Sequence, residues 1–393
     1  MKKTSPLACF FVFLNVSCLL AQCDPSSGFD PSGHPCIFYS NARTSAAFLR
    51  IVPDARSGAM GDVAIALTPD ANSISFNASK LAMADKKWGG SVNYTPWMTN
   101  WGDNLKMFLS HGAGYYQFGK KRKHAIGFSY DYFSLGAIQW EYFSLLQTDI
   151  IPIEKAFTGA YAIQLNKKWA FGLAAKYIHT SISTRSKNLN IWDFQNLSPN
   201  YAFAADISTT YKTSVTVLGK ETNVVLGAAL SNFGSRIAYR WARSSDFLPT
   251  NLGIGGSWNI KFNEDNRLLV ALDLNKLLVV TPKLTDTVDA NKNYIGDWKE
   301  ISVAKSMLKS ITDSPYGFKD ISTSFGLEYW LKQHIVFRTG YHYQNEATGG
   351  RNFFTFGGGV RYKAVGLNVS YLKSARPTTD PLDKTWRFSL LLN

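Results

Sequence analysis

The residues of this 393-residue chain that could do acid–base, nucleophilic or metal chemistry are few and scattered. Six histidines are spread along it, among them His34 near the start and His179 and His342 close to the ends of candidate strands. No P-loop, HExxH, GxSxG or paired CxxC motif brings a nucleophile, a base or metal ligands together. The glycines of Gly-Gly-Gly-Val-Arg-Tyr at 357–362 lie in a candidate strand and do not lead into a phosphate-binding helix. We therefore expect no catalytic residue, no metal and no cofactor, and a protein that is not an enzyme.

The first residues of the chain indicate an exported protein, and this bears on its cysteines. Residues 1–22 are typical of a secretory signal peptide, since two lysines precede an apolar stretch that ends at Ala21. Cleavage there leaves Cys23 and Cys36. In an oxidising periplasm these two could form a disulfide across a Pro- and Gly-rich leader, or they could stay free thiols. Because Gln22 precedes Cys23, lipidation of this cysteine is disfavoured.

Most of the chain after residue 87 alternates between apolar and small or polar residues with a period of two, as amphipathic strands do. Ile126, Phe128 and Tyr130, for example, share one face, with small residues between them. Fourteen such segments are found, at 88–97, 107–119, 123–134, 154–166, 168–181, 199–213, 221–231, 249–261, 266–276, 321–332, 334–344, 352–363, 366–373 and 385–393.

The connections between these segments alternate between short and long. Those after the even-numbered segments are short turns, whereas those after the odd-numbered ones cover 98–106, 135–153, 182–198, 232–248, 277–320, 345–351 and 374–384. This alternation and the even strand number are typical of a transmembrane β-barrel with short periplasmic turns and longer outer loops. The predicted fold is all-β: a fourteen-stranded antiparallel barrel in the cell outer membrane.

The composition agrees with a barrel and excludes other classes. Aromatic residues make up 14% and charged residues 18%, with a mean hydropathy of −0.12. No apolar run of 18 or more residues follows the signal segment, which argues against a helical membrane protein. The formal charge of +14, or +12 without Lys2 and Lys3, would suit nucleic acid in a cytoplasmic protein. The signal peptide and the strands instead predict outer-membrane lipid as a neighbour and no nucleic-acid partner.

Charged residues in the middle of the candidate strands fall on the small, polar face. A Lys or Arg that faces lipid at the membrane midplane costs roughly 2–4 kcal/mol, so these side chains are expected to face a polar lumen. Four acids and four bases suggest pairs of opposite charge inside the barrel. The eight residues are Asp131, Lys176, Asp206, Asp273, Glu328, Arg338, Arg361 and Arg387.

The segment before the strands has a different character. Residues 23–40 form an irregular leader, and residues 41–86 are rich in Ala, Ser and Gly without a sustained period of two. Small residues allow close packing, so this segment could plug one end of the barrel. The expected organisation is a signal peptide at 1–22, a leader and plug at 23–86, and the barrel at 87–393.

Two further surfaces are indicated by the connections. The predicted periplasmic turns are basic, which suits either anchoring to phosphate headgroups or docking of a periplasmic partner. Their cations are Lys120, Lys121, Arg122, Lys123, Lys167, Lys168, Lys212, Lys261, Lys332 and Lys363. The largest outer loop, 277–320, contains Trp298, Tyr316 and Phe318, and we expect these aromatics to bind a partner.

Several motifs resemble a known family. The segment Ala-Arg-Ser-Gly-Ala-Met-Gly-Asp at 55–62 is similar to the N-terminal signature of FadL-like outer-membrane barrels. The segments 273–283, 314–362 and 381–393 resemble the PorV (LptO) family of the type IX secretion system within that group. The likeness extends over essentially the whole mature chain. Asn77-Ala-Ser-Lys-Leu-Ala departs from the Asn-Pro-Ala of many FadL-type chains, and Asn393 stands where many outer-membrane proteins end in an aromatic residue.

The resemblance implies a non-enzymatic component of protein secretion. PorV-type proteins associate with a large translocon barrel of the Sov/SprA type and capture the C-terminal domains of secreted proteins. They deliver this cargo to an attachment complex that contains a PorU-type sortase. By the same likeness, Arg56, Asp62 and Asn77 would anchor the plug.

Two alternatives remain open from the sequence. A FadL-like passive transporter of hydrophobic small molecules would need an apolar pocket beside the plug. A lipopolysaccharide-modifying enzyme would need a serine, a histidine and an acid clustered at one end of the barrel, and no compact motif supplies them.

Overall fold

A computed structural model describes residue 42 and residues 44–98, 106–142, 146–184, 200–217, 220–237, 245–281, 301–376 and 382–392. The signal segment, Cys23, Cys36 and Trp298 lie outside these residues.

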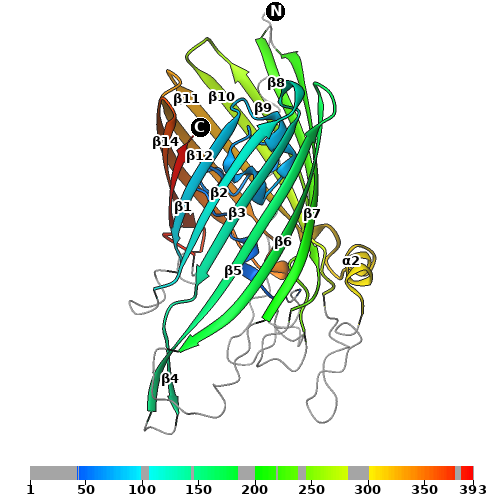
Figure 1. Cartoon of the computed structure of the whole chain (residues 1–393), viewed down its shortest axis with the longest axis vertical. Coiled ribbons are helices and arrows are strands. Elements are labelled where there is room, and N and C mark those ends of the chain that lie inside the picture. The colour runs from blue at the N-terminus through cyan, green and yellow to red at the C-terminus, as the bar shows by residue number, and fades with distance from the viewer. Residues whose placement is uncertain are drawn as a thin grey trace, which may run out of the picture.

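The described strands form one closed antiparallel barrel (Figure 1). Each barrel strand pairs with the next along the chain, β1 pairs with β15, and β3 pairs directly with β5. This leaves β4 (Ile138–Tyr142) outside a ring of fourteen. The ring consists of β1 (Trp88–Pro96), β2 (Phe108–Phe118), β3 (His124–Ser134), β5 (Leu146–Gln164), β6 (Trp169–Thr184), β7 (Asn200–Val217), β8 (Lys220–Gly234), β9 (Asn251–Lys261), β10 (Arg267–Leu277), β11 (Ile321–Leu331), β12 (Ile335–Tyr343), β13 (Phe353–Tyr362), β14 (Val365–Ser374) and β15 (Trp386–Leu392).

The predicted fold class is therefore confirmed, with one correction. The segment 135–153 was expected to be a loop, but β4 and the first residues of β5 pair as a hairpin, from Ile138 opposite Ile150 to Tyr142 opposite Leu146. In Figure 1 this hairpin projects beyond the ring of strands. A hairpin in that position has neither lipid on one face nor lumen on the other, so it lacks the residue pattern that reveals the barrel strands.

The two ends of the barrel differ. We call the end with the long connections the outer end, and the opposite end, with the short connections, the turn end. β4 and α2 (Val303–Thr312) lie at the outer end, whereas β1 starts and β15 finishes at the turn end (Figure 1). From the usual asymmetry of outer-membrane barrels, we infer that the outer end is extracellular and the turn end periplasmic.

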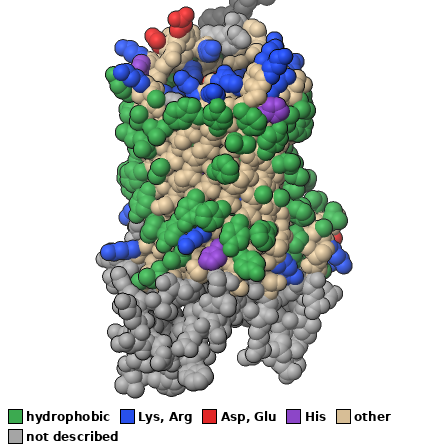
Figure 2. Space-filling model, in the orientation of Figure 1, with side chains coloured by type: hydrophobic (Ala, Val, Ile, Leu, Met, Phe, Trp, Pro, Cys, Tyr) green, Lys and Arg blue, Asp and Glu red, His purple; other side chains and the backbone are tan. Residues whose placement is uncertain are grey.

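The outer wall is apolar and the inside is largely polar. Phe128 is 66% exposed on the wall, whereas the next residue, Ser129, is 7% exposed and faces inward. Figure 2 shows hydrophobic side chains on the face of the wall in view and Lys and Arg side chains gathered at the turn end. Aromatic pairs such as Trp169–Tyr211 and Tyr371–Trp386, each with ring centroids 4.8 Å apart, link neighbouring strands. No helix among the described residues is long and apolar enough to cross a membrane.

Residues 44–86, the interior segment, run inside the ring of strands (Figure 1). The segment has little regular structure: η2 (Ala47–Arg50), α1 (Ala55–Gly58), η3 (Ala71–Ser75) and η4 (Ala78–Met83). The other short helices are η5 (Lys120–Arg122), η8 (Gly317–Asp320) and η9 (Glu346–Thr348). That the interior segment closes the pore as a plug stays a prediction.

Glycines let the interior segment approach the wall. A Cβ atom added to Gly340 of β12 would lie 2.1 Å from the backbone N of Gly61, which itself has a φ of +68°. A Cβ atom on Gly172 of β6 would lie 2.4 Å from the backbone N of Ser79. Only a glycine permits backbone contact this close.

Candidate functional site

The described part of the β10–β11 connection is attached firmly to the outer end of the barrel. Phe247, Val279 and Ile301 form a buried apolar cluster beneath it. The backbone N–H of Val280 donates a hydrogen bond of 3.0 Å to the Oγ atom of Ser306 in α2. The helix is therefore held in place on the barrel.

α2 presents apolar side chains to its surroundings. Its small residues Ser306 and Ser310 are buried, so the helix turns this face toward the barrel. Leu308 and Ile311 are 65% and 58% exposed, and residues three apart lie on the same side of a helix. Phe318, just beyond the helix, is 91% exposed. An apolar surface formed by Leu308, Ile311 and Phe318, which we call the outer apolar patch, is left without a partner among the described residues.

The two described aromatics of this loop, which were expected to bind a partner together, lie in different environments. Phe318 belongs to the outer apolar patch, but Tyr316 is partly buried and lines a cavity inside the barrel. Asp320 fixes the end of this segment through Lys276 Nζ at 2.9 Å and through the hydroxyl of Ser314. Of the two aromatics that the structure describes here, Phe318 is the one placed to meet a partner from outside.

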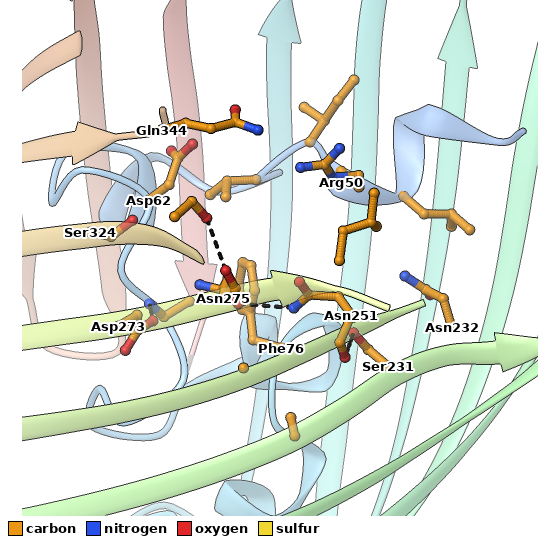
Figure 3. Close-up of a pocket in the computed structure, with 18 of the residues that line it drawn as sticks. Arg50, Asp62, Phe76, Ser231, Asn232, Asn251, Asp273, Asn275, Ser324 and Gln344 are labelled. Carbon is orange, nitrogen blue, oxygen red and sulfur yellow. Dashed lines mark hydrogen bonds between the residues drawn. The ribbon is translucent and has the colours of Figure 1, made fainter. Parts of the chain in front are cut away.

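The cavity lined by Tyr316 lies between the interior segment and the outer end, and its volume is about 360 Å³ (Figure 3). Its lining is mixed: Arg50 and Asp62 of the interior segment face it, together with polar residues from the strands such as Asn275. The Asn251 side-chain amide donates a hydrogen bond of 2.9 Å to Asn275 Oδ1 across two strands. A chamber of this size could hold a small amphipathic molecule.

A buried ion-pair network joins the interior segment to the wall. The Arg56 guanidinium donates two hydrogen bonds to Glu328, of 2.9 and 3.0 Å, and contacts Asp70 at 3.2 Å. Glu328 also accepts from Arg338 Nε at 2.7 Å and from Trp330 Nε1 at 3.0 Å. Burial alone would lower the pKa of Arg56, but the charges of Glu328 and Asp70 outweigh it and raise that pKa. Arg56 is therefore charged at all relevant pH values.

Asp62 and Asn77, the other expected anchors, also contact the barrel. Asp62 Oδ1 lies 3.4 Å from the guanidinium of Arg387 on β15. Asn77 Nδ2 donates to Thr210 Oγ1 at 3.0 Å and to the carbonyl of Ile65 at 3.0 Å. Asn77 thus links two turns of the interior segment to β7. The contacts suit an anchoring role, which stays a proposal.

The eight mid-strand charges all face inward, but they pair with one another only in part. Glu328 pairs with Arg338, and Lys176 Nζ lies 2.7 Å from Asp206. Asp273 instead accepts hydrogen bonds from the backbone N–H groups of Ala64 and Ile65, at 2.7 and 2.9 Å. Arg387 contacts Asp62, Asp131 contacts His111, and Arg361 stacks near Trp330. The interior segment thus supplies partners that the strands lack.

The structure brings together a serine, a histidine and an acid that no compact sequence motif predicts. His111 Nδ1 lies 2.7 Å from Asp131 Oδ1, and Ser75 Oγ lies 3.5 Å from His111 Nε2. A hydrolase would also need backbone N–H groups free to bind an oxyanion. The N–H groups of Phe76 and Asn77, next along the chain, both donate to the carbonyl of Ser73. We interpret the cluster as part of the polar lining of the barrel.

Some functional candidates could not be recognised from the sequence. Lys80, on the interior segment, is 3% exposed and donates to the carbonyl of Ala64 at 2.6 Å. Burial lowers the pKa of Lys80 to about 8. Trp330, near the turn end, has the guanidinium groups of Arg267 and Arg361 over its ring. No spacing rule in the sequence links these residues.

With this geometry in place, the chain can be compared with known proteins. A family described as Type IX secretion system protein PorV matches residues 40–284. This range includes the interior segment and the strands from β1 to β10. No curated protein sequence gives a match.

Three solved structures have a similar course of the chain, and two of them are described as toluene transporters. The Ralstonia pickettii toluene transporter TbuX is 14% identical, with 86% of this chain and 97% of that chain covered and a TM-score of 0.47. The Pseudomonas putida toluene transporter TodX is 12% identical, with 90% and 97% covered and a TM-score of 0.43. A Pseudomonas aeruginosa FadL homologue is 11% identical, with 86% and 97% covered and a TM-score of 0.41. None of these likenesses bears on what the present chain binds.

Proposed function

The chain belongs to the PorV family of type IX secretion system proteins and is an outer-membrane component of that system, and on this premise we propose that it binds secreted cargo at its outer end. The cargo would be recognised by its C-terminal signal domain, as the resemblance to PorV-type proteins suggests. The barrel would receive it beside a large translocon barrel of the Sov/SprA type. It would then pass the cargo to the attachment complex with its PorU-type sortase.

The observation that carries this proposal is the outer apolar patch. Leu308, Ile311 and Phe318 are exposed at the end of the barrel that we infer to be extracellular. Full burial of such a side chain contributes roughly 1.5–3 kcal/mol, so a partner that covers them gains affinity. The hydrogen bond from Val280 to Ser306 holds the helix in position beforehand, which reduces the entropy lost on binding. A fixed apolar surface outside the membrane suits a folded protein domain better than passage through the lumen.

The test is a binding measurement on the full-length protein in detergent. Purified C-terminal signal domain of a secreted protein is titrated against wild type and against Leu308→Ser/Ile311→Ser. We expect the double variant to bind at least about tenfold more weakly, because two apolar contacts are removed. Retention of the folded barrel is checked by its heat-modifiable mobility on gel electrophoresis.

A matched control uses the same helix. Lys305→Ser/Asp313→Ser introduces two serines at exposed positions, leaves the net charge unchanged and spares the apolar side chains. This variant should bind cargo as wild type does. Equal affinity of all three proteins for the signal domain would rule out the outer apolar patch as the cargo site.

A second candidate function is supported by the cavity of about 360 Å³. Phe48, Ile51 and Leu277 supply apolar lining and Asn275 supplies a polar group, a combination that suits a small hydrophobic molecule with one polar end. In that case the protein would take up or hold such molecules, as a FadL-like transporter does. Native mass spectrometry of the purified barrel distinguishes the two: a bound small hydrophobic molecule that is lost in Leu277→Asp would favour transport.

A further inference from the structure

A second cavity lies at the turn end, far from the outer apolar patch, and its volume is about 130 Å³. Three strand ends form its wall: Arg267 starts β10, Trp330 is next to the last residue of β11, and Arg361 is next to the last residue of β13. Arg338 of β12 also lines it. Figure 2 shows that Lys and Arg side chains gather at this end of the molecule.

The cavity is organised around one indole ring. The guanidinium carbon atoms of Arg267 and Arg361 lie 4.9 and 5.2 Å from the centroid of Trp330, and that of Arg338 lies 5.9 Å from it. Trp330 is itself 5% exposed, so it provides a rigid surface. Stacking on an aromatic ring holds a guanidinium in a fixed plane while its N–H groups remain able to donate.

The acids near this cavity are already engaged. Both oxygens of Glu328 are used, by Arg56 and Arg338 and by the Trp330 indole N–H. Asp70, another lining residue, contacts Arg56 at 3.2 Å. Glu328 and Asp70 thus make direct ion pairs with Arg56 and Arg338, whereas they act on the two outer arginines only at longer range.

Arg267 and Arg361 therefore have acids nearby but no acid in direct contact among the described residues. Within the part of the chain that the structure describes, neither forms an ion pair with an acid, and both are partly buried. Asp85 at the mouth is exposed, and its charge acts on Arg267 and Arg361 through space without an ion-pair contact. Two partly desolvated cations close to each other repel, and a bound anion between them would relieve this cost.

We propose that Arg267 and Arg361 form a binding site for a small oxyanion of the phosphate class at the turn end of the barrel. Planar guanidinium groups present paired N–H donors that match the oxygens of phosphate and sulfate. The cavity volume is roughly ten times the 10–15 Å³ that one water requires, which leaves room for a tetrahedral oxyanion and some of its waters.

The same chemistry has two possible sources. One is free inorganic phosphate or sulfate in the periplasm. The other is the phosphate of a lipid headgroup, because the cavity includes Val360, whose side chain is 54% exposed on the wall of the barrel. The inner leaflet of the outer membrane would lie beside these strand ends.

The experiment compares the full-length protein with two variants of equal charge change. Arg267→Gln/Arg361→Gln removes the two guanidinium groups from the cavity. Lys332→Gln/Lys363→Gln removes two exposed cations from the neighbouring turns and leaves the cavity intact. Each protein, in a non-ionic detergent, is titrated with inorganic phosphate by calorimetry at constant ionic strength, and its co-purified lipids are identified by native mass spectrometry. The thermal unfolding midpoint without phosphate reports whether each variant is folded.

A site for free oxyanion would be supported by two results together. Wild type and the lysine variant should bind phosphate saturably, and the arginine variant should bind it at least about tenfold more weakly. A phospholipid that remains bound to wild type and the lysine variant but not to the arginine variant would support the headgroup as its source. The proposal is overturned if wild type binds neither, or if a folded arginine variant binds both as wild type does.

Discussion

At the scale of single residues, charged side chains of the strands and of the interior segment form ion pairs inside the barrel. Glu328 on β11 is contacted by Arg338 of the next strand and by Arg56 of the interior segment. All three side chains are at least nine-tenths buried. Removing one partner from such a group leaves a buried charge without compensation, which costs far more than the pair itself contributes.

Glu328→Gln should therefore lower the free energy of unfolding by about 3–5 kcal/mol, because Arg56 and Arg338 would both lose their carboxylate. Urea unfolding of the detergent-solubilised barrel, followed by tryptophan fluorescence, measures this change. Glu346→Gln is the control: it makes the same chemical change in the ion pair with Arg376, whose side chains are partly exposed. Exposed pairs contribute about 0–1 kcal/mol, so the control should unfold almost as wild type does. Equal effects of the two substitutions would contradict the importance of the buried network.

Part of this network could be predicted from the sequence. A period of two places Glu328 and Arg338 on the inner face, and the short turn between their strands makes them direct partners in register. His111 and Asp131 face each other across β2 and β3 for the same reason. Arg56 could not be paired in this way, because it lies 272 residues from Glu328 on a segment without regular structure. Register is local, whereas the path of the interior segment depends on the whole barrel.

At the scale of elements, the glycines of the wall determine how closely the interior segment can approach the strands. Gly340 on β12 touches the backbone at Met60 and Gly61, and Gly357 on β13 faces the Cβ of Ala59. Contacts of this kind join α1 and the following turn to strands that come some 280 residues later in the chain. The glycines that interrupt the strand pattern are thus explained by what lies inside the barrel.

Gly340→Ala should destabilise the barrel by about 1–3 kcal/mol, since its Cβ would lie 2.1 Å from backbone atoms that cannot move aside easily. The thermal midpoint of the heat-modifiable band measures the loss. Gly159→Ala on β5 is the matched control, because its Cβ would meet a single side-chain atom at 3.9 Å. If both alanine variants unfold at the same temperature as wild type, the interior segment does not contact β12 as closely as described.

The elements that the sequence did not predict share a physical cause. A period of two in the sequence is typical of strands with lipid on one side and lumen on the other. The β4 hairpin lies beyond both environments, and α2 has helical spacing instead: Leu308 and Ile311 lie three apart behind a capping Ser302. Neither region fits the residue pattern of the barrel wall, so that pattern predicts loops at both.

At the scale of the whole molecule, the described residues give the two ends of the barrel different surfaces. The outer end presents the outer apolar patch, and the turn end presents cations. One hollow at the turn end, of about 320 Å³, is lined by Lys121, Arg122, Lys167, Lys168 and Lys212 and by no acid among the described residues. Ala82, Met83 and Ala84 of the interior segment also line it, so the hollow borders the inside of the barrel. This position favours an acidic periplasmic partner over phosphate headgroups.

Reversing the charge of one turn should separate these two roles. Lys120→Glu/Lys121→Glu/Lys123→Glu changes the β2–β3 turn beside the hollow and spares Arg122, whose guanidinium donates to the carbonyl of Asp85 at 3.1 Å. Lys261→Glu/Lys332→Glu/Lys363→Glu makes the same change in net charge on turns across the barrel mouth. If the hollow docks a partner, only the first variant should reduce recovery of the native secretion complex on affinity purification. If the cations only meet lipid headgroups, both variants should instead lose the same amount of binding to vesicles of anionic phospholipid, and the complex should be recovered in full with either of them.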